Sequence, residues 1–280
     1  QVPYSERTHI LVVTKKIAKT PKAYPRNAGK PKNLLFNMKN YTKKFKLPID
    51  LIRGKKMRKY FGTDGIRGRA YDFLTYDLAV LVGQSLQVLG AKSLVIARDT
   101  RESGAMLVDG IIKGARSIGM NISDIGIAPT PMLAYCSARL GFIGIMVTAS
   151  HNAYYDNGIK IFNKGHKLSL EEEALIEKVL NGEVNVEEKA GHTVVQKPLN
   201  TMLIYNELFT GIYPQSTLSI GLDLANGAAC RTAKEIFSKV SSNVRCIGDQ
   251  PDGRNINHQV GSTHLNAIQR LVKEESLDIG

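Results

Sequence analysis

Hydrophobic and polar positions follow two different patterns between residues 75 and 147 of this chain. Short apolar runs predict buried strands at residues 94–97, 122–127 and 142–147. Stretches with apolar residues three or four positions apart predict helices at residues 75–89, 103–118 and 131–140. Thr75 is a suitable N-cap for the first helix, and Gly90 is a suitable stop. This alternation of strands and helices predicts an α/β fold with a mixed, mainly parallel sheet.

Further predicted elements complete a first domain and make up a second. Ser169 and Glu172 form a capping-box pattern that predicts a helix to Leu180, and the polar stretch 182–197 is predicted to be a hairpin or loop. A linking helix is predicted at residues 201–213. The elements predicted after it are a strand at 218–223, a turn at 226–227, a helix at 233–240, a strand at 244–248 and a helix at 263–275. We therefore expect a first domain at residues 57–197 and a second at 198–280.

The charge distribution separates residues 1–56 from the rest of the chain. This segment contains 15 Lys and Arg residues and two acidic residues, Glu6 and Asp50. The remaining residues carry 23 charges of each sign, so the segment accounts for the whole net charge of +13. Its aromatic residues are interspersed with the cations, as in some RNA-binding arms. We expect a disordered basic appendage without a nucleic-acid partner, and a noncatalytic RNA-binding fusion is the alternative.

The composition is typical of a globular protein of about two domains. Hydrophobic residues make up 43% of the 280, and no apolar run reaches the ~18 residues needed to cross a bilayer. The three cysteines and six histidines lack the spacing of disulfide frameworks or zinc sites. We therefore expect a cytoplasmic protein without a membrane partner, and the association of identical copies remains open.

Candidate chemistry begins at the end of the predicted strand 142–147. Two small residues precede Ser150, so its hydroxyl is expected to be accessible at the carboxyl end of the strand, where open α/β sheets bind ligands. Asp-Asn-Gly at 156–158 is a turn signal, and the strand predicted after it at 159–162 would return Lys160 toward the serine loop. A serine beside a lysine suits phosphoryl transfer, although Ser-His-Asn is also common in ordinary turns.

A second segment adds a further cation. Residues 60–69 read Tyr-Phe-Gly-Thr-Asp-Gly-Ile-Arg-Gly-Arg, with three glycines at a spacing of three. This pattern predicts a compact loop whose backbone amides and Arg67 face an anion. The alternative for Arg67 is a salt bridge to Asp64 or a neighbour.

Together the two segments resemble the α-D-phosphohexomutase superfamily, and within it the bacterial phosphoglucosamine mutase family most closely. Further motifs follow in the same order: Asp-Thr-Arg at 99–101, Pro-Thr-Pro at 129–131, Asp-Leu-Ala-Asn-Gly at 223–227 and Pro-Asp-Gly-Arg-Asn-Ile-Asn at 251–257. The resemblance covers residues 57–280 and implies αβα domains of the phosphohexomutase type.

The resemblance also implies a reaction. A phosphoserine at Ser150 would interconvert glucosamine 6-phosphate and glucosamine 1-phosphate through a 1,6-bisphosphate, toward UDP-N-acetylglucosamine and cell-wall precursors. Lys160 and Arg67 would stabilise phosphoryl charge, and Arg101 would also bind phosphate. His151 would handle a proton or orient the loop. Mg²⁺ would be held by the Ser150 phosphate and by aspartates of a further loop. Phosphomannomutase or phosphoglucomutase activity is the alternative.

Two features depart from the family pattern. Ala153 stands where Pro usually follows Ser-His-Asn, which removes a fixed φ. The sequence ends at Gly280, before the Asp-Gly-Asp-Gly-Asp magnesium loop and two further domains, so we expect a fragment that is inactive alone. Residues 1–36 resemble the tail of a ribosomal RNA small-subunit guanine methyltransferase family, so the mutase is expected to begin at Met57.

Overall fold

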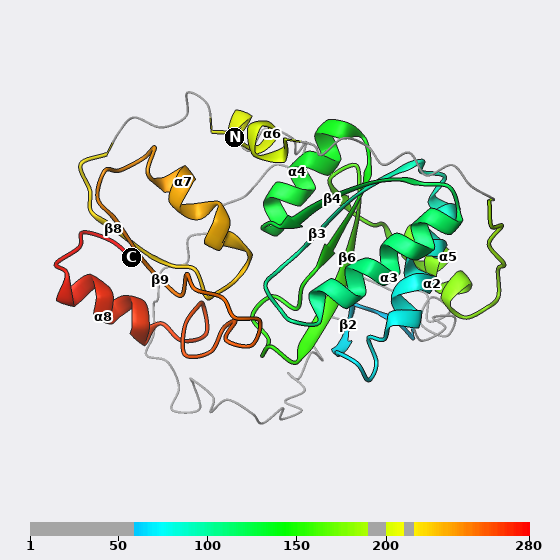
Figure 1. Ribbon diagram of the computed structural model, residues 1–280, viewed down its shortest axis with the longest axis horizontal. Helices are drawn as coiled ribbons and strands as arrows, with labels where there is room; N and C mark the ends of the chain where they lie inside the picture. Colours follow the sequence, from blue (N-terminus) through cyan, green and yellow to red (C-terminus); the bar gives the residue numbers. More distant parts are fainter. Residues whose placement is uncertain (1–58, 190–199, 210–215) are drawn as a thin grey trace, which may run out of the picture. The chain divides into compact units, whose positions relative to one another are not determined.

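The computed structural model describes residues 59–189, 200–209 and 216–280 (Figure 1). The chain divides into a unit of residues 1–55 and a unit of residues 56–280. The predictions for the basic segment 1–56, namely its disorder, its RNA-binding alternative and its methyltransferase resemblance, lie outside the described residues. The carboxyl-terminal parts of the predicted loop 182–197 and of the predicted helix 201–213 also lie outside them.

Residues 61–167 contain a mixed sheet of seven strands. The strands are β1 Phe61–Gly62, β2 Gly65–Arg69, β3 Ser93–Arg98, β4 Asn121–Ile127, β5 Ile143–Val147, β6 Asp156–Asn163 and β7 His166–Lys167. Their order is β1-β2-β6-β5-β3-β4, and β7 pairs with β6. The predicted mixed α/β sheet is confirmed.

Parallel pairing is confined to three strands of this sheet. β3 is parallel to β4 and to β5, whereas β6 is antiparallel to β5, β2 and β7, and β1 is antiparallel to β2. Only eight residues separate β5 from β6. Because a parallel crossover needs about a dozen residues or more, β6 has to return antiparallel.

Helices cover both faces of the sheet (Figure 1). They are α2 Tyr76–Ser85, α3 Gly104–Ser117, α4 Thr130–Leu140, α5 Leu170–Leu180 and α6 Thr201–Glu207. α2, α3 and α5 contribute to one apolar cluster, and α4 and α6 contribute to another. Side chains alternate along β3, so Leu94 and Ile96 belong to the first cluster while Val95 and Ala97 belong to the second. The layers are therefore helix, sheet and helix.

Local signals set the ends of these helices as predicted. The Thr75 hydroxyl accepts a hydrogen bond from Leu78 N at 3.2 Å and caps α2. α2 continues into a 3₁₀ helix, Leu86–Leu89, which ends at Gly90 in the left-handed conformation. Both hydrogen bonds of the predicted capping box at the start of α5 are present.

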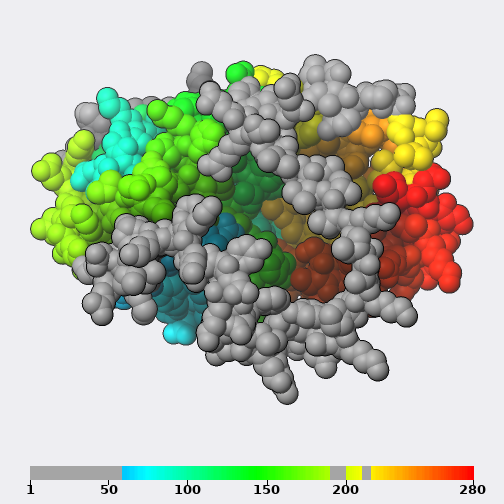
Figure 2. Space-filling model, turned by 180° about the vertical axis from the view of Figure 1, so that it is seen from behind, coloured from blue at the N-terminus to red at the C-terminus, as the bar shows by residue number. Residues whose placement is uncertain are grey.

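Residues 216–280 form a smaller region with little core of its own. Its elements are β8 Ile220–Asp223, η2 Ala228–Arg231, α7 Ala233–Phe237, β9 Val244–Ile247 and α8 Asn266–Glu274. β8 and β9 pair in parallel. The buried apolar residues of this region are Leu224, Ala233, Ile256 and Leu277. α8 has no buried residue, and the last residues of the chain, red in Figure 2, lie at the surface.

The predicted turn at residues 156–158 is wrong. These residues begin β6 and pair with β2. The Asn157 side chain is buried and donates a hydrogen bond to Ser103 Oγ at 2.9 Å. A Cβ atom at Gly158 would lie 2.7 Å from the carbonyl oxygen of Thr148. Close packing of neighbouring strands, rather than a turn, therefore accounts for the glycine.

The predicted compact loop at residues 60–69 is a hairpin made of β1 and β2. Its second strand extends the sheet beside β6, so Arg67 lies opposite Gly158 in the register. Among the helices of the described residues, none is long and apolar enough to cross a membrane.

Candidate active site

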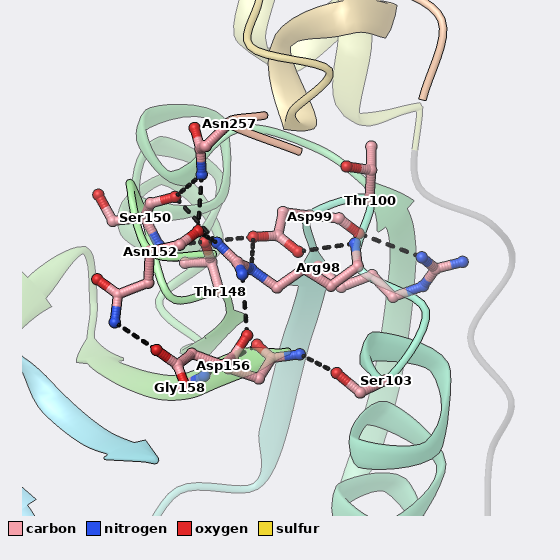
Figure 3. A network of polar contacts seen from close by, with 12 residues as sticks. Arg98, Asp99, Thr100, Ser103, Thr148, Ser150, Asn152, Asp156, Gly158 and Asn257 are labelled. Carbon is pink, nitrogen blue, oxygen red and sulfur yellow. Dashed lines mark hydrogen bonds and ion pairs between the residues drawn. The ribbon is translucent and has the colours of Figure 1, made fainter. Parts of the chain in front are cut away.

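Ser150 lies in the loop that joins β5 to β6, at the carboxyl end of β5 (Figure 3). It is exposed, whereas Thr148 and Ala149 before it are buried. Its φ of 58° lies in the left-handed region, which is disfavoured for most residues that carry a Cβ. Its N–H donates to Thr148 Oγ1 at 3.0 Å. The expected exposed position at the end of the strand is confirmed, while the role of Ser150 stays a prediction.

Arg101 lies beneath the serine loop with no exposed surface. Its Nε donates to Asp99 Oδ2 at 2.9 Å. Its two terminal nitrogens donate to four loop carbonyls, those of Ala153, Asp156, Ser150 and Asn152. These contacts use all five N–H groups of the guanidinium. The prediction that Arg101 binds substrate phosphate does not agree with this geometry, because no donor remains for a phosphate. Arg101 is a positioning residue for the loop.

Asp99 balances the buried charge of Arg101. Its side chain is almost fully buried, and it accepts hydrogen bonds from Arg101 Nε, from Arg101 N at 3.1 Å and from Thr148 Oγ1 at 2.6 Å. A buried ion pair is tolerated when further hydrogen bonds satisfy both partners, and this pair meets that condition. Because Asp99 follows β3 and Thr148 follows β5, the pair links the ends of two adjacent strands to the loop.

Asn257, from the region 216–280, contacts the same loop. Its Nδ2 donates to the carbonyl oxygen of Ser150 at 2.8 Å and to that of Asn152 at 3.0 Å (Figure 3). Both carbonyls also accept from Arg101. The sequence placed Asn257 in a motif without assigning it a role. Its contact with Ser150 joins residues 107 positions apart, so no local pattern reveals it.

Arg67 and Lys160 converge on Asp64. Arg67 NH2 lies 2.5 Å and Lys160 Nζ 2.7 Å from Asp64 Oδ2, so the salt bridge considered as an alternative for Arg67 is present. The hydrogen bond from Lys160 and the charges of both cations hold the pKa of Asp64 below its ordinary value, against an opposing effect of burial. Within the described part of the chain, neither cation makes a hydrogen bond or ion pair to Ser150.

One donor of this cluster is unused. The Nε atom of Arg67 is buried and has no hydrogen-bond partner. A buried N–H without a partner is costly, and a bound anion would satisfy it. The cluster therefore has capacity for an anionic group beyond Asp64.

His151 is exposed beside an open hollow of about 560 Å³. The hollow is also lined by residues of the segment 252–264, among them Arg254, His258 and His264. Among the residues that the structure describes, the His151 imidazole makes no hydrogen bond or ion pair. Asp252 also lines the hollow and Arg254 is paired with Glu102, so the lining carries charges of both signs.

The described residues do not make up the Mg²⁺ site that the family resemblance implies. Mg²⁺ takes oxygen ligands in near-octahedral geometry. Over residues 59–189, 200–209 and 216–280, no group of three or more His, Cys, Asp or Glu side chains is placed to hold a metal ion. Asp99, the carboxylate under the serine loop, is already engaged by Arg101 and Thr148. We therefore assign no step to a metal.

Comparison with known families identifies the class of protein that carries this loop. Residues 58–187 match the family described as phosphoglucomutase/phosphomannomutase, alpha/beta/alpha domain I. The matched range contains the seven-stranded sheet together with Ser150, Arg67 and Lys160. This part of the chain belongs to the phosphohexomutase superfamily.

Within that superfamily the chain is phosphoglucosamine mutase-like. It is 42% identical over 236 residues to the phosphoglucosamine mutase of Alkaliphilus metalliredigens and 39% identical over 236 residues to that of Streptococcus pneumoniae. Each alignment covers 80% of this chain but only 53% and 52% of the respective relative. The chain thus spans about half the length of the curated relatives that it matches.

A solved structure has the same fold. The phosphoglucomutase/phosphomannomutase family protein of Burkholderia thailandensis superposes with a TM-score of 0.63, over 76% of this chain and 49% of that chain. The sequence identity is 22%, so the likeness establishes the fold alone.

Proposed function

We propose that residues 57–280 are the phosphoserine-bearing part of a phosphoglucosamine mutase, which interconverts glucosamine 6-phosphate and glucosamine 1-phosphate. The observation that carries this proposal is the setting of Ser150. The loop is fixed through backbone carbonyls by the buried Asp99–Arg101 pair, and the Ser150 hydroxyl makes no hydrogen bond within the described residues. The serine is thus held firmly while its oxygen stays available for phosphate.

The proposed cycle begins with phosphoserine at position 150. A hydroxyl oxygen of the hexosamine phosphate forms a bond to phosphorus as the bond to Ser150 Oγ breaks, and the hydroxyl proton passes to Oγ. The product is the 1,6-bisphosphate. The reverse step at the other end of the sugar returns a phosphoryl group to Ser150, so that the net change moves phosphate between O6 and O1.

The remaining residues have supporting roles in this proposal. Lys160 and Arg67 stabilise phosphoryl charge, for which a phosphate oxygen joins or replaces Asp64 at the cations. His151 adjoins Ser150 on the exposed loop and either carries the proton or orients the loop. We propose in addition that the complete enzyme works in the cytoplasm and requires Mg²⁺. Its product would supply UDP-N-acetylglucosamine for the cell wall.

The first test is phosphorylation of Ser150. The protein for this test is a hybrid that completes residues 57–280 with the carboxyl-terminal remainder of the Alkaliphilus metalliredigens enzyme. After incubation with glucosamine 1,6-bisphosphate and Mg²⁺, intact-mass analysis of the hybrid should show one added phosphoryl group, and the hybrid with Ser150→Ala should lack it. Ser238→Ala, which changes an exposed serine far along the chain, should still accept the group. Phosphate mapped to a residue other than Ser150 would overturn the assignment.

The second test is turnover. The chain alone should convert glucosamine 6-phosphate orders of magnitude more slowly than a hybrid that joins residues 57–280 to the carboxyl-terminal remainder of the Alkaliphilus metalliredigens enzyme, because a metal site contributes several kcal/mol to such steps. Glucose and mannose phosphates, assayed in parallel, distinguish the phosphoglucomutase and phosphomannomutase alternative. Equal turnover by the chain and the hybrid would contradict the proposal.

A further inference from the structure

Ser150 has a backbone conformation that requires support from its surroundings. A serine in the left-handed region persists where neighbouring contacts outweigh its intrinsic preference. The Ser150 N–H is bound by Thr148, and the Ser150 carbonyl accepts two hydrogen bonds. Its position is therefore determined from both sides of the residue.

The two donors to the Ser150 carbonyl come from different parts of the molecule. Arg101 donates from beneath the loop, and Asn257 donates from the region 216–280. The same two side chains also share the carbonyl of Asn152. A carbonyl oxygen has two lone pairs, so both donors can bind at once, and together they saturate the two carbonyls.

The two donors differ in how firmly they are anchored to the first domain. Arg101 is buried and all its side-chain N–H groups are hydrogen-bonded. If it left the loop, Asp99 would lose its ion-pair partner. Asn257 is presented by its own region, since its backbone N–H donates to the carbonyl of Ala225 at 2.9 Å. Among the described residues of the region 216–280, Asn257 is the one whose side chain hydrogen-bonds to the serine loop.

Other contacts bring the two regions together but do not reach Ser150. Glu102 N donates to the carbonyl of Gly253 at 3.0 Å, and the Thr100 hydroxyl donates to the carbonyl of Asn226. The ion pair between Arg254 and Glu102 is exposed. These contacts dock residues 216–280 on the loop that contains Arg101, and Asn257 extends the docking to the serine itself.

We infer that Asn257 is a positioning residue that couples docking of residues 216–280 to the backbone conformation of Ser150. The inference rests on the proposed function, because it gives the conformation of Ser150 a consequence for phosphoryl transfer. When Asn257 is withdrawn, Arg101 alone holds the two carbonyls, and the loop samples conformations that present the serine hydroxyl differently. Phosphoryl transfer to and from Ser150 is then slower.

The direct test measures hydrogen exchange of the loop amides of Ser150, Asn152 and Asp156, which are hydrogen-bonded in the structure. Asn257→Ala should accelerate their exchange about tenfold, the effect of losing two ordinary hydrogen bonds. The control, His258→Ala, changes the next residue in the same hollow and should leave the exchange unchanged. Unchanged exchange in Asn257→Ala, or equal acceleration in both variants, would overturn the inference.

A second measurement links the loop to chemistry. In the hybrid enzyme, the rate of Ser150 phosphorylation by glucosamine 1,6-bisphosphate should fall about tenfold in Asn257→Ala and further in Asn257→Asp, whose carboxylate repels the two carbonyls. Protonation turns that carboxylate into a donor, so the ratio of Asn257→Asp to Asn257→Ala rates should rise as the pH falls. A ratio independent of pH would contradict the positioning role, whereas absence of phosphorylation in the hybrid with Asn257 unchanged would refute the proposed function and leave the exchange result to decide the positioning role.

Discussion

The region 59–180 and the region 216–280 are stabilised in different ways. The first has two apolar clusters, one on each face of its sheet, and their fully buried members include Leu107 and Leu133. The second has four buried apolar residues and a terminal helix without a buried side chain. Since apolar burial is the main source of folding stability, the first region supplies most of it. The second region packs Ala228 and Ile236 against the second cluster and adds polar contacts with the loops around Arg101 and Ser150.

The largest expected contrast is between the buried ion pair of the first region and an exposed ion pair that joins the two regions. Arg101→Met should lower the free energy of unfolding by about 3–5 kcal/mol, because it leaves Asp99 buried without its counter-charge. Arg254→Met removes the exposed pair with Glu102 and should cost about 0–1 kcal/mol. Urea denaturation of both variants measures the two values. Similar losses of unfolding free energy would mean that the buried Asp99–Arg101 pair contributes no more to stability than an exposed ion pair.

Core truncation compares the two regions directly. Leu107→Ala in α3 should cost about 3 kcal/mol, since the residue is fully buried and a cavity remains. Leu271→Ala in α8 should cost about 1 kcal/mol, since that residue is only partly buried. Thermal unfolding followed by circular dichroism tests both. A larger loss for Leu271→Ala would show that residues 216–280 have a more important apolar interior than the described residues indicate.

Acid should weaken both regions slightly. The hydrogen bond from Lys160 lowers the pKa of Asp64 in the first region, and hydrogen bonds from Ser219 lower the pKa of Asp278 in the second. A carboxyl group with a lowered folded-state pKa contributes stability above its unfolded pKa, and this contribution is lost as the pH falls through the folded pKa. Asp64→Asn and Asp278→Asn should therefore each flatten the decline in melting temperature below roughly pH 4.

A control for the acid series is Asp72→Asn, because Asp72 is exposed and makes no hydrogen bond or ion pair among the described residues. Its melting temperature should follow that of the unmodified chain at every pH. If the Asp64 and Asp278 variants behave like this control, their hydrogen bonds do not contribute to stability.

The elements between residues 75 and 147 could be predicted because their signals are local. The apolar period, the Thr75 cap and the stop at Gly90 all act within a few residues. The place of Ser150 could be predicted for the same reason, since a buried strand ends just before it. The assignment of residues 156–158 to a turn failed because their strand pairing with β2 involves residues about 90 positions away.

The candidate site was predictable in its residues but not in its contacts. Arg101 was expected at a phosphate, yet its burial and its four carbonyl partners depend on a loop about 50 positions later. Lys160 was expected near the serine because of the supposed turn, and it contacts Asp64 on the neighbouring hairpin. Asn257 could be assigned a role only once two distant segments had been placed together.

Arg101 holds the serine loop through backbone carbonyls, and this affects which residues of the loop can be substituted without loss of stability. Arg101 contacts the backbone oxygens of Ala153, Asp156, Ser150 and Asn152, and a carbonyl is present whatever the side chain. The alanine at position 153, where the resemblance leads one to expect proline, presents the same acceptor. Position 153 can therefore change while the loop keeps its path, whereas Thr148 and Asn152 also hold the loop through side-chain hydrogen bonds. Arg101 itself has no substitute, because lysine offers three donors in place of five and none in a planar fork.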